Sequence, residues 1–519
     1  MTLTETRPPA PRPGRVRVVS GPCPRRVRTA RNPARAAPGR RPHRAHTALS
    51  CAITPRQARR ERRPDVSDEA VARARAMGML AAMPPTPDAT QAPSVGPDRG
   101  RADACPGALR LHAAEDGHLA RLRLPGGQLT HRQMNAVADA ADALGNGDIE
   151  ITSRGNAQLR GLTAHCAADL AERLRAVGLL PSDTHERVRN IVASPLAGLD
   201  GHGTGGEQIT DWVRELDLAL CAAPWAAALS GKFLFALDDG RGDVAALDAD
   251  VTLIAVGDGR ALLRYGRAPR ATAVDTTAGT PVAAALDAAR RILDLAAGRA
   301  WHAREIQHAL PAGDTPLPPP LGGGRTALGR LPGALSVAPR LGRASSAQWR
   351  LLAEALGPAA PDRARLTPWR GVVLPHADPD WLPRLAAAGF RTAPGGPWEG
   401  VTACTGLPGC AKSRADVRAQ AARAVAAAPA TGLPVHWSGC ERRCGHPAGR
   451  WVDVLATPTG HRVTLDGATR DTAPDETAGA VAAARATQGA STESPTVQTS
   501  TAQSPTTVQS PTAPRRRPA

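Results

Sequence analysis

Four cysteines gathered in one short part of the chain constrain its fold more than any other feature. Cys404 and Cys410 are followed by Cys440 and Cys444, so a stretch of 41 residues holds two closely spaced pairs. Clustered cysteines in an intracellular chain indicate a metal or redox site rather than disulfides. The fold must therefore bring two loops, separated by about 30 residues, to one point.

The spacing of these cysteines favours one kind of metal centre. Four thiolates from a Cys-x5-Cys and a Cys-x3-Cys loop can hold a [4Fe–4S] cluster, with one thiolate on each iron. Glycines flank both pairs and would let the backbone approach a bulky cluster and donate N–H groups to its sulfurs. A structural zinc site is the alternative, but its cysteine pairs are usually two to four residues apart.

The charge of the chain does not indicate a nucleic-acid partner. The net charge is +18, but residues 1–75 hold 19 arginines against five carboxylates, and three more arginines lie at 515–517. A nucleic-acid enzyme would carry its basic patch on the folded part. The middle of the chain is close to neutral, so we expect no nucleic-acid partner.

Composition also separates two tails from the folded part. Residues 1–98 are rich in Arg, Pro and Ala, and residues from 471 onward are rich in Ser, Thr, Gln and Pro. Neither composition can bury a core, so both tails are predicted to be disordered. No run of 18 apolar residues suggests a membrane span, and no signal peptide is apparent, so we expect a cytoplasmic protein.

The intervening span appears twice in outline. In the first copy a short alternating strand leads to a turn at Gly126-Gly127, an amphipathic helix after Thr130 and a second strand from Asp148. Thr130 with Gln133 predicts a capping box for the helix. A stretch near residues 333–375 has the same order of strand, turn, capped helix and strand. This pattern predicts a duplicated α+β fold.

Further segments extend the repeat. Residues 187–198 correspond to 399–410, and residues 229–240 correspond to 437–448, which puts Lys232 at the position of Cys440. Lys232 is one of two lysines among 65 basic residues, and the other, Lys412, lies in the motif of the first cysteine pair. Such selective use of lysine indicates a need for a compact ammonium group.

Together the motifs identify a family. RLRLPGG, TSRGNAQLRG, VRNIVASPLAG, LSGKFLFALDDG, ACTGLPGCAKS and SGCERRCGHP stand in the order found in the sulfite and nitrite reductase superfamily and cover about residues 100–460. The chain resembles in particular the precorrin-3B synthase family, which oxidises a tetrapyrrole in aerobic cobalamin biosynthesis. The segments SPLAGLDG, GKFLFALDDG and CTGLPGCAKS carry this closer resemblance.

The resemblance implies an organisation and a set of site residues. It implies two ferredoxin-like units at 99–180 and 321–395, a tetrapyrrole-binding unit at 181–320 and a cluster-binding unit at 396–470. An anionic tetrapyrrole needs basic side chains for its carboxylates. The implied substrate-binding residues are Arg121, Arg123, Arg154, Arg189 and Lys232, and Lys232 and Arg154 are also expected to be catalytic.

The implied reaction converts precorrin-3A, with O2 and reductant, into precorrin-3B by hydroxylation and γ-lactone formation. A separate iron centre for oxygen activation is left open. The motif Gly201–Gly206 follows a proline-containing loop rather than a strand, which argues against a dinucleotide site, so a separate reductase is the expected electron donor. The alternative is a sirohaem-dependent sulfite or nitrite reductase, but Leu234 stands where sulfite reductases have a second lysine.

Overall fold

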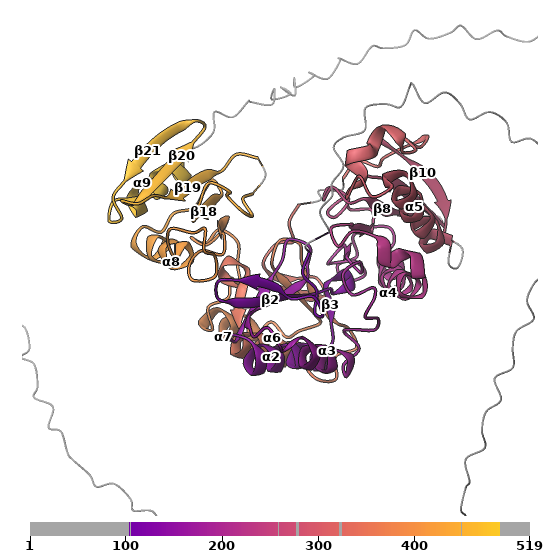
Figure 1. Cartoon of the computed structure of the whole chain (residues 1–519), viewed down its shortest axis with the longest axis horizontal. Coiled ribbons are helices and arrows are strands. Elements are labelled where there is room, and N and C mark those ends of the chain that lie inside the picture. The colour runs from indigo at the N-terminus through magenta and orange to yellow at the C-terminus, as the bar shows by residue number, and fades with distance from the viewer. Residues whose placement is uncertain are drawn as a thin grey trace, which may run out of the picture. The chain divides into compact units, whose positions relative to one another are not determined.

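The computed structural model describes residues 103, 105–257, 259–276, 280–320, 324–447 and 449–487. The tail expected at 1–98 and the part of the second tail beyond residue 487 lie outside these ranges. In the described ranges the chain forms four sheets with helices packed on them, which confirms the α+β class (Figure 1). No helix in this part of the chain combines the length and the apolarity that a bilayer span requires.

Two of the sheets form a pair of ferredoxin-like units that exchange a strand. Strand β14 of the second unit closes the first sheet, and β3 of the first unit closes the second sheet. At the crossing, Gly127 has a φ of +68° and a Cβ there would lie 2.1 Å from the carbonyl oxygen of Leu366, so only glycine fits. The first sheet is β1 (His112–Ala114), β2 (Gly117–Leu122), β5 (Ala157–Leu162), β4 (Asp148–Ile151) and β14 (Arg343–Ser345); the second is β12 (Gly329–Leu331), β13 (Ala334–Val337), β16 (Val372–Pro375), β15 (Ala364–Leu366) and β3 (Gln128–Leu129).

The exchange leaves the two ferredoxin-like units with a single hydrophobic core. Ile149 and Leu159 of the first unit and Trp349 and Leu374 of the second are buried in the same cluster. Helices α2 and α6 pack on each other across it. The helices of this layer are α2 (His131–Leu144), α3 (Ala167–Arg175), α6 (Ser346–Leu356) and α7 (Trp381–Ala387), with short 3-10 turns η1 (Pro125–Gly127) and η4 (Arg340–Gly342).

The other two sheets each begin with three parallel strands and continue with antiparallel ones. Each packs its helices on an apolar core of its own. The first is β6 (Ile191–Ala193), β7 (Phe235–Asp238), β8 (Val251–Gly257), β9 (Arg260–Tyr265), β10 (Arg270–Asp275) and β11 (Thr315–Pro316), with α4 (Gly206–Ala222), η2 (Pro224–Ala228), α5 (Thr280–Ala296) and η3 (Ala303–Ala309). The second is β17 (Val401–Ala403), β18 (Val435–Ser438), β19 (Val452–Ala456), β20 (His461–Leu465) and β21 (Ala468–Thr472), with α8 (Val417–Ala427) and α9 (Thr477–Ala486).

The duplication is present, but its expected register is wrong by two residues in the segments that contain β6 and β17 and by eight residues in those that contain β7 and β18. Strand β6 pairs with β7 through Ile191 and Phe235, just as β17 pairs with β18 through Val401 and Val435. Lys232 comes before β7, whereas Cys440 comes after β18, so the two are not equivalent. Insertions of different length between the paired strands shifted the alignment by sequence.

The expected C-terminal boundary at residue 470 is also wrong. Strand β21 continues to Thr472, and α9 packs Val481 into the core of the last sheet. Arg485 is 3 % exposed and donates hydrogen bonds to the carbonyl oxygens of Leu433 and Pro397. An alanine-rich helix buries little apolar area per residue, which is why its composition resembled that of a tail.

The capping box expected at Thr130 is confirmed, and it recurs in the second unit. Thr130 Oγ1 and Ser345 Oγ accept hydrogen bonds from the N–H groups of Gln133 and Gln348, and each Gln side chain accepts a bond from its cap residue.

We expect Thr130→Ala and Ser345→Ala each to lower the free energy of unfolding by about 1 kcal/mol, because each leaves N–H groups of a helix start without a partner. Chemical denaturation of the full chain measures this loss. Thr464→Ala, whose hydroxyl contacts only the exposed Thr469 in the structure, is the control and should be neutral. Equal midpoints for all three variants would contradict the expected role of the caps.

Candidate functional site

The two cysteine loops meet because the strands before them are parallel neighbours. Cys404 follows β17, and Cys440 follows β18 after Gly439. The carboxyl ends of parallel strands lie at the same edge of a sheet, so both loops begin there. The backbone N–H of Gly439 donates to Cys404 Sγ at 3.2 Å, and a Cβ at Gly439 would lie 1.8 Å from Ser413 Oγ. The structure thus brings together the loops that the spacing predicted.

The environment of the thiols at this edge is that of a metal-binding site. Burial raises the pKa of the Cys404 thiol and the neighbouring Cys440 and Cys410 raise it further, although the N–H groups of Gly439 and Gly406 oppose them. Three of the four thiols, Cys404, Cys410 and Cys440, are close enough for each negative sulfur to oppose the ionisation of Cys404, whereas Cys444 is exposed. A coordinated thiol loses its proton, and backbone N–H groups stabilise the charged sulfur. The donor set therefore fits an iron–sulfur cluster.

An arginine of the first ferredoxin-like unit holds one of these loops. Arg160 on β5 donates to the carbonyl oxygen of Gly409 at 2.8 Å and forms an ion pair with Asp116 at 2.8 Å. The Arg160 side chain is 7 % exposed. The sequence TSRGNAQLRG carried this residue, and strand alternation puts Arg160 on the same side as Gln158, but its partner 249 residues away could not be foreseen.

Three of the expected substrate-binding arginines lie close together. Arg121 is on β2, Arg123 directly follows it, and Arg154 is in the turn between β4 and β5. Arg123 donates to the carbonyl oxygens of Arg187 at 3.1 Å and Gly231 at 3.2 Å. Arg121 Nε and Arg123 Nη1 are buried and have no hydrogen-bond partner in the part of the chain that the structure describes.

Carboxylates near this arginine group do not offset the effect of its burial. Burial, together with the charges of Arg121 and Arg154, lowers the pKa of Arg123 to about 9. The pKa values of Arg121 and Arg154 are lowered as well, chiefly by burial. Among the described residues none of the three forms an ion pair within 4.0 Å. Buried cations of this kind favour a negatively charged ligand.

Lys232 adjoins the same group. Its carbonyl oxygen accepts a hydrogen bond from Arg154 Nη1 at 2.8 Å. Its ammonium lies 3.3 Å from the ring centroid of Trp301, within range of a cation–π interaction. Asp103 holds the loop before Lys232 by accepting from Ser230 Oγ at 3.1 Å and from the N–H of Gly231. Trp301 was not foreseen, since it lies 69 residues further along the chain.

Among the described residues Arg189, unlike Arg121 and Arg123, already pairs with a carboxylate of the protein. Arg189 is 3 % exposed, and it forms an ion pair with Asp217 of α4 at 2.6 Å. Its Nη1 donates to the carbonyl oxygen of Leu179 at 3.1 Å. All three guanidinium nitrogens of Arg189 bind the protein and fasten α4 to the loop before β6, and its expected role in substrate binding stays a prediction.

Other polar residues of the site were missed by sequence reasoning. Gln158 and Glu150 lie beside Arg121 on the sheet, and Arg418 of α8 reaches Glu150. Arg370 lies in the turn after β15, where Thr367 Oγ1 accepts a hydrogen bond from the N–H of Gly371 at 3.0 Å. The turn that contains Arg154 has the same bond, in which Thr152 Oγ1 accepts from the N–H of Asn156 at 3.2 Å. The repeat of this turn was the signal that could have found Arg370.

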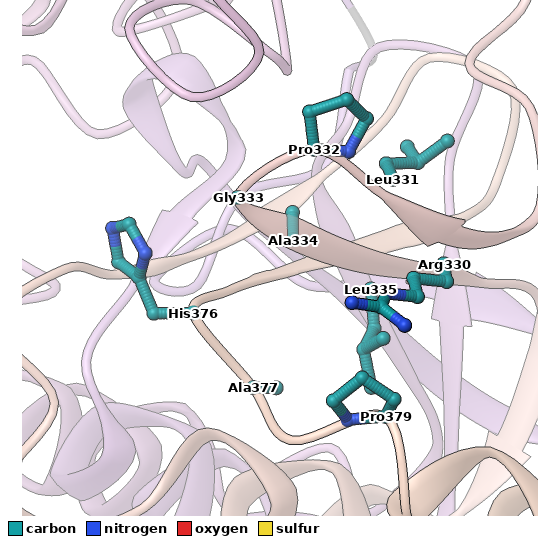
Figure 2. Close-up of a pocket in the computed structure, with 9 residues that line it drawn as sticks. All are labelled: Arg330, Leu331, Pro332, Gly333, Ala334, Leu335, His376, Ala377 and Pro379. Atoms are coloured by element: carbon teal, nitrogen blue, oxygen red, sulfur yellow. The ribbon is translucent and has the colours of Figure 1, made fainter.

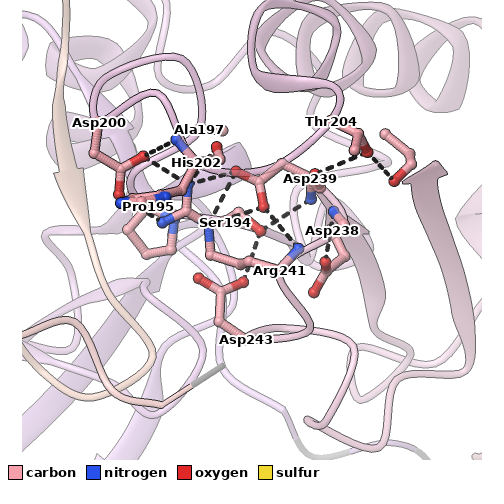
Figure 3. Close-up of polar contacts among 12 residues, drawn as sticks. Ser194, Pro195, Ala197, Asp200, His202, Thr204, Asp238, Asp239, Arg241 and Asp243 are labelled. Carbon is pink, nitrogen blue, oxygen red and sulfur yellow. Dashed lines mark hydrogen bonds and ion pairs between the residues drawn. The ribbon is translucent and has the colours of Figure 1, made fainter. Parts of the chain in front are cut away.

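The first half carries a counterpart of the cysteine site that holds no cysteine. Ser194 follows β6, and its Oγ accepts from the N–H of Asp239 at 3.1 Å, the same bond that Gly439 makes to Cys404. Figure 3 shows Asp238, Asp239 and Asp243 around this serine with Arg241. Ligand atoms of the three carboxylates all lie within 4.8 Å of one another.

These carboxylates are already satisfied by the protein. Asp238 accepts hydrogen bonds from four backbone N–H groups, those of Gly240, Gly242, Val244 and Ala245, at 2.8 to 3.1 Å. Asp239 pairs with Arg241 at 2.7 Å, and Asp243 accepts from Ser194 Oγ at 2.6 Å. The group forms the framework of a loop, so we assign the separate iron centre left open above to none of these residues.

A surface cavity of about 560 Å³ lies apart from both loops (Figure 2). It is formed by the β12–β13 hairpin and the segment after β16, and His376 at its side pairs with Asp362 at 3.0 Å. It contains neither the cysteines nor the arginine group. Its lining residues are Arg330, Leu331, Pro332, Gly333, Ala334, Leu335, His376, Ala377 and Pro379.

Comparison with known proteins agrees with this geometry. Residues 112–177, from β1 to the end of α3, match the nitrite/sulfite reductase ferredoxin-like half domain. A precorrin-3B synthase of Sinorhizobium sp. is 32% identical over 418 residues, which cover 75% of this chain and 86% of that protein. The chain belongs to the precorrin-3B synthase family.

The wider relationships follow from local matches and from the fold. A ferredoxin–nitrite reductase of Synechococcus elongatus is 46% identical over 84 residues, 16% of each chain. The structure of the Mycobacterium tuberculosis NirA protein covers 70% of this chain and 79% of its own, with a TM-score of 0.51 and 20% identity. The precorrin-3B synthase family is thus part of the sulfite and nitrite reductase superfamily, whose members are oxidoreductases.

The acidic loop of the first half generates a prediction about pH. Burial, followed by the charge of Asp238, raises the pKa of Asp243 to about 7. An unfolded aspartate titrates near 4, so the folded chain binds the extra proton between about pH 4 and 7 and loses stability as the pH rises through that range. Asp243→Asn removes this dependence. We expect the stability of the variant relative to the wild type to increase by about 2 to 3 kcal/mol between pH 5 and pH 8, because the unfolded aspartate is already ionised at pH 5 and Asp243 of the folded chain is not.

Denaturation at both pH values measures the difference. Asp200→Asn is the control of opposite sign, because its ion pair with Arg241 outweighs burial and lowers the pKa of Asp200. Asp200→Asn should therefore destabilise at pH 8. A wild-type stability that does not fall between pH 5 and 8 relative to Asp243→Asn would contradict the raised pKa.

Proposed function

We propose that this chain catalyses the oxygen-dependent conversion of precorrin-3A to precorrin-3B. One atom of O2 enters the product as the new hydroxyl group, and the other leaves as water at the expense of two electrons and two protons. An acetate arm of the macrocycle closes the γ-lactone. The family relationship supports the substrate class, and the arginine group supports an anionic ligand.

The observation that carries the proposal is the arginine group with buried, unused donors. Arg121 Nε and Arg123 Nη1 point at no acceptor among the described residues, and each such buried donor costs about 1 to 3 kcal/mol. A carboxylate arm would remove that cost with a charge-assisted bond. Lys232 and Arg154 lie beside them, so several arms of one macrocycle could be held at once and an acetate oriented toward its target carbon.

The four cysteines are proposed to hold a [4Fe–4S] cluster. A bound cluster would supply single electrons at the edge of the sheet. The chain's own part is to hold the thiolates apart, to donate N–H groups from Gly439 and Gly406 to Cys404, and to fix the first loop through Arg160. The described part of the chain is accounted for by the two ferredoxin-like units and the two α/β units, so a separate reductase is the proposed electron source.

A sirohaem-dependent sulfite or nitrite reductase is the second candidate, favoured by the local identity to nitrite reductases. Leu234 argues against sulfite reduction. It is 4 % exposed and packs with Val192 and Ala236 in a small apolar cluster, so its position offers no cation to an oxyanion.

Anaerobic purification of the full chain, with iron, sulfide and sirohaem quantified, separates the two candidates. Precorrin-3A, reductant and O2 are then added, and mass spectrometry follows the gain of one oxygen atom. Turnover of precorrin-3A by protein that contains iron and sulfide but no sirohaem supports the proposal. Bound sirohaem with reduction of sulfite or nitrite would replace it with the second candidate.

Serine substitution tests the cluster assignment. We expect Cys404→Ser, Cys410→Ser, Cys440→Ser and Cys444→Ser each to lose the cluster absorbance, because a serine hydroxyl is a poor ligand for iron in such a cluster. Cys166→Ser and Cys221→Ser are matched controls, since Cys166 is buried at the start of α3 and Cys221 lies at the end of α4. Full iron and sulfide in Cys410→Ser would contradict the assignment.

Substitution of Lys232 tests the substrate site. Lys232→Met keeps a stem that can rest on Trp301 and removes the charge. Tetrapyrrole binding should weaken by about 1.5 to 3 kcal/mol, as expected for a lost charge-assisted bond, while iron content is unchanged. Lys232→Arg should restore binding only in part, because a planar fork does not replace a point charge.

Fluorescence titration of both variants gives the affinity. Lys412→Met is the control, because Lys412 is the only other lysine of the sequence and its side chain is exposed. Wild-type affinity in Lys232→Met would show that Lys232 does not contact the macrocycle.

A further inference from the structure

A continuous chain of hydrogen bonds joins the first cluster cysteine to the arginine group. Arg418 Nε donates to the carbonyl oxygen of Cys404 at 3.2 Å, and Arg418 Nη1 binds Glu150 Oε1. Gln158 Nε2 donates to Glu150 Oε2 at 2.9 Å, and Arg121 Nη2 donates to Gln158 Oε1 at 2.8 Å. This series of hydrogen bonds runs from Arg418 through Glu150 and Gln158 to Arg121.

The sheet fixes the middle of this chain. Arg121 lies opposite Gln158 on β2 and β5, and Gln158 lies opposite Glu150 on β5 and β4. Residues that face each other across antiparallel strands have their side chains on the same side, close enough to bond. The order of the three side chains is thus a consequence of strand register, and Arg418 reaches them from α8 of the last α/β unit.

The direction of these hydrogen bonds is set by Glu150, which can only accept, and by Arg121, which can only donate. A carboxylate can only accept hydrogen bonds, so Gln158 must present its NH2 group to Glu150. The Gln158 carbonyl oxygen then has to face Arg121, which can only donate. If Glu150 were an amide, both orientations of Gln158 would be allowed, and one of them would put an NH2 group against Arg121.

Glu150 is also held as an anion. It is 9 % exposed. Burial raises the pKa of its carboxyl, but the charge and hydrogen bond of Arg418, with the charges of Arg160 and Arg343, outweigh burial and leave the pKa below its usual value. An acceptor-only group is therefore present at neutral pH.

We propose that Glu150 is a positioning residue that sets Arg121 for substrate carboxylates through Gln158 and balances the charge of Arg418 beside Cys404. This role rests on the proposed function. Because Gln158 holds Nη2 of Arg121, the unpartnered Nε is left at a fixed place for a ligand. The same carboxylate neutralises a guanidinium that contacts the backbone of a cluster ligand.

Two variants separate the positioning of Arg121 from the balancing of the Arg418 charge. Gln158→Leu removes the hydrogen bonds that link Arg121 to Glu150 and leaves the ion pair between Glu150 and Arg418 intact. Glu150→Gln disturbs both, and Glu150→Asp keeps an acceptor-only group and should restore binding in part. The control is Asp148→Asn, which removes a carboxylate two residues away on β4 whose partner Arg343 is 40 % exposed.

The measurements are the affinity for uroporphyrin III, which carries acetate and propionate arms, and the midpoint potential of the cluster, both on the full chain. We expect Gln158→Leu and Glu150→Gln to weaken uroporphyrin III binding about ten- to hundred-fold. Only Glu150→Gln should raise the midpoint potential, because the uncompensated charge of Arg418 favours the reduced cluster. Asp148→Asn should change neither.

The affinities and the midpoint potentials test the two roles of Glu150 separately. Wild-type affinity in both Gln158→Leu and Glu150→Gln overturns the positioning role while leaving the proposed function in place. An unchanged midpoint potential in Glu150→Gln overturns the charge-balancing role. If the wild-type chain does not bind uroporphyrin III, the positioning role fails, while turnover of precorrin-3A decides the proposed function separately. If Glu150→Gln does not fold, the affinity of Gln158→Leu decides the positioning role.

Discussion

In a parallel strand pair both chains arrive at the same edge of the sheet, and the residues that follow must share the space beyond it. Strands β17 and β18 bring Cys404 and Cys440 together in this way, and β6 and β7 do the same for Ser194 and Asp239. The positions of these four residues depend on this strand pairing. The ferredoxin-like units then supply the side chains that lie opposite, such as Arg160 against Gly409.

Local patterns were enough to predict much of this arrangement. Thr130 and Gln133 located the start of α2 correctly, and the spacing of the cysteines indicated two loops at one centre. The register of the repeat was not predictable, because the segments before β7 and β18 differ in length. Strand pairing shows that Ser194 corresponds to Cys404 and that Gly240, not Lys232, corresponds to Cys440. The exchange of β3 and β14 leaves no trace in local composition.

Long-range partners explain the remaining omissions. Arg189 and Arg121 both lie in motifs that the family resemblance singled out, yet Asp217 neutralises the first, and among the described residues no carboxylate pairs directly with the second. Sequence shows that a cation is present but not whether the fold already supplies its anion. Arg418 and Glu150 are 268 residues apart, so their pair became visible only when α8 and β4 were placed together.

The same comparison explains why one half of the duplication can hold metal and the other need not. In both halves a backbone N–H donates to the side chain after the first strand, at 3.1 Å to Ser194 and 3.2 Å to Cys404. In the first half the following loop turns its carboxylates inward, and its own N–H groups and Arg241 satisfy them. In the second half Cys440 of the following loop, together with Cys410, raises the pKa of Cys404. A shared backbone frame therefore carries a closed polar loop in one half and, in the other, a set of thiols that could bind a metal.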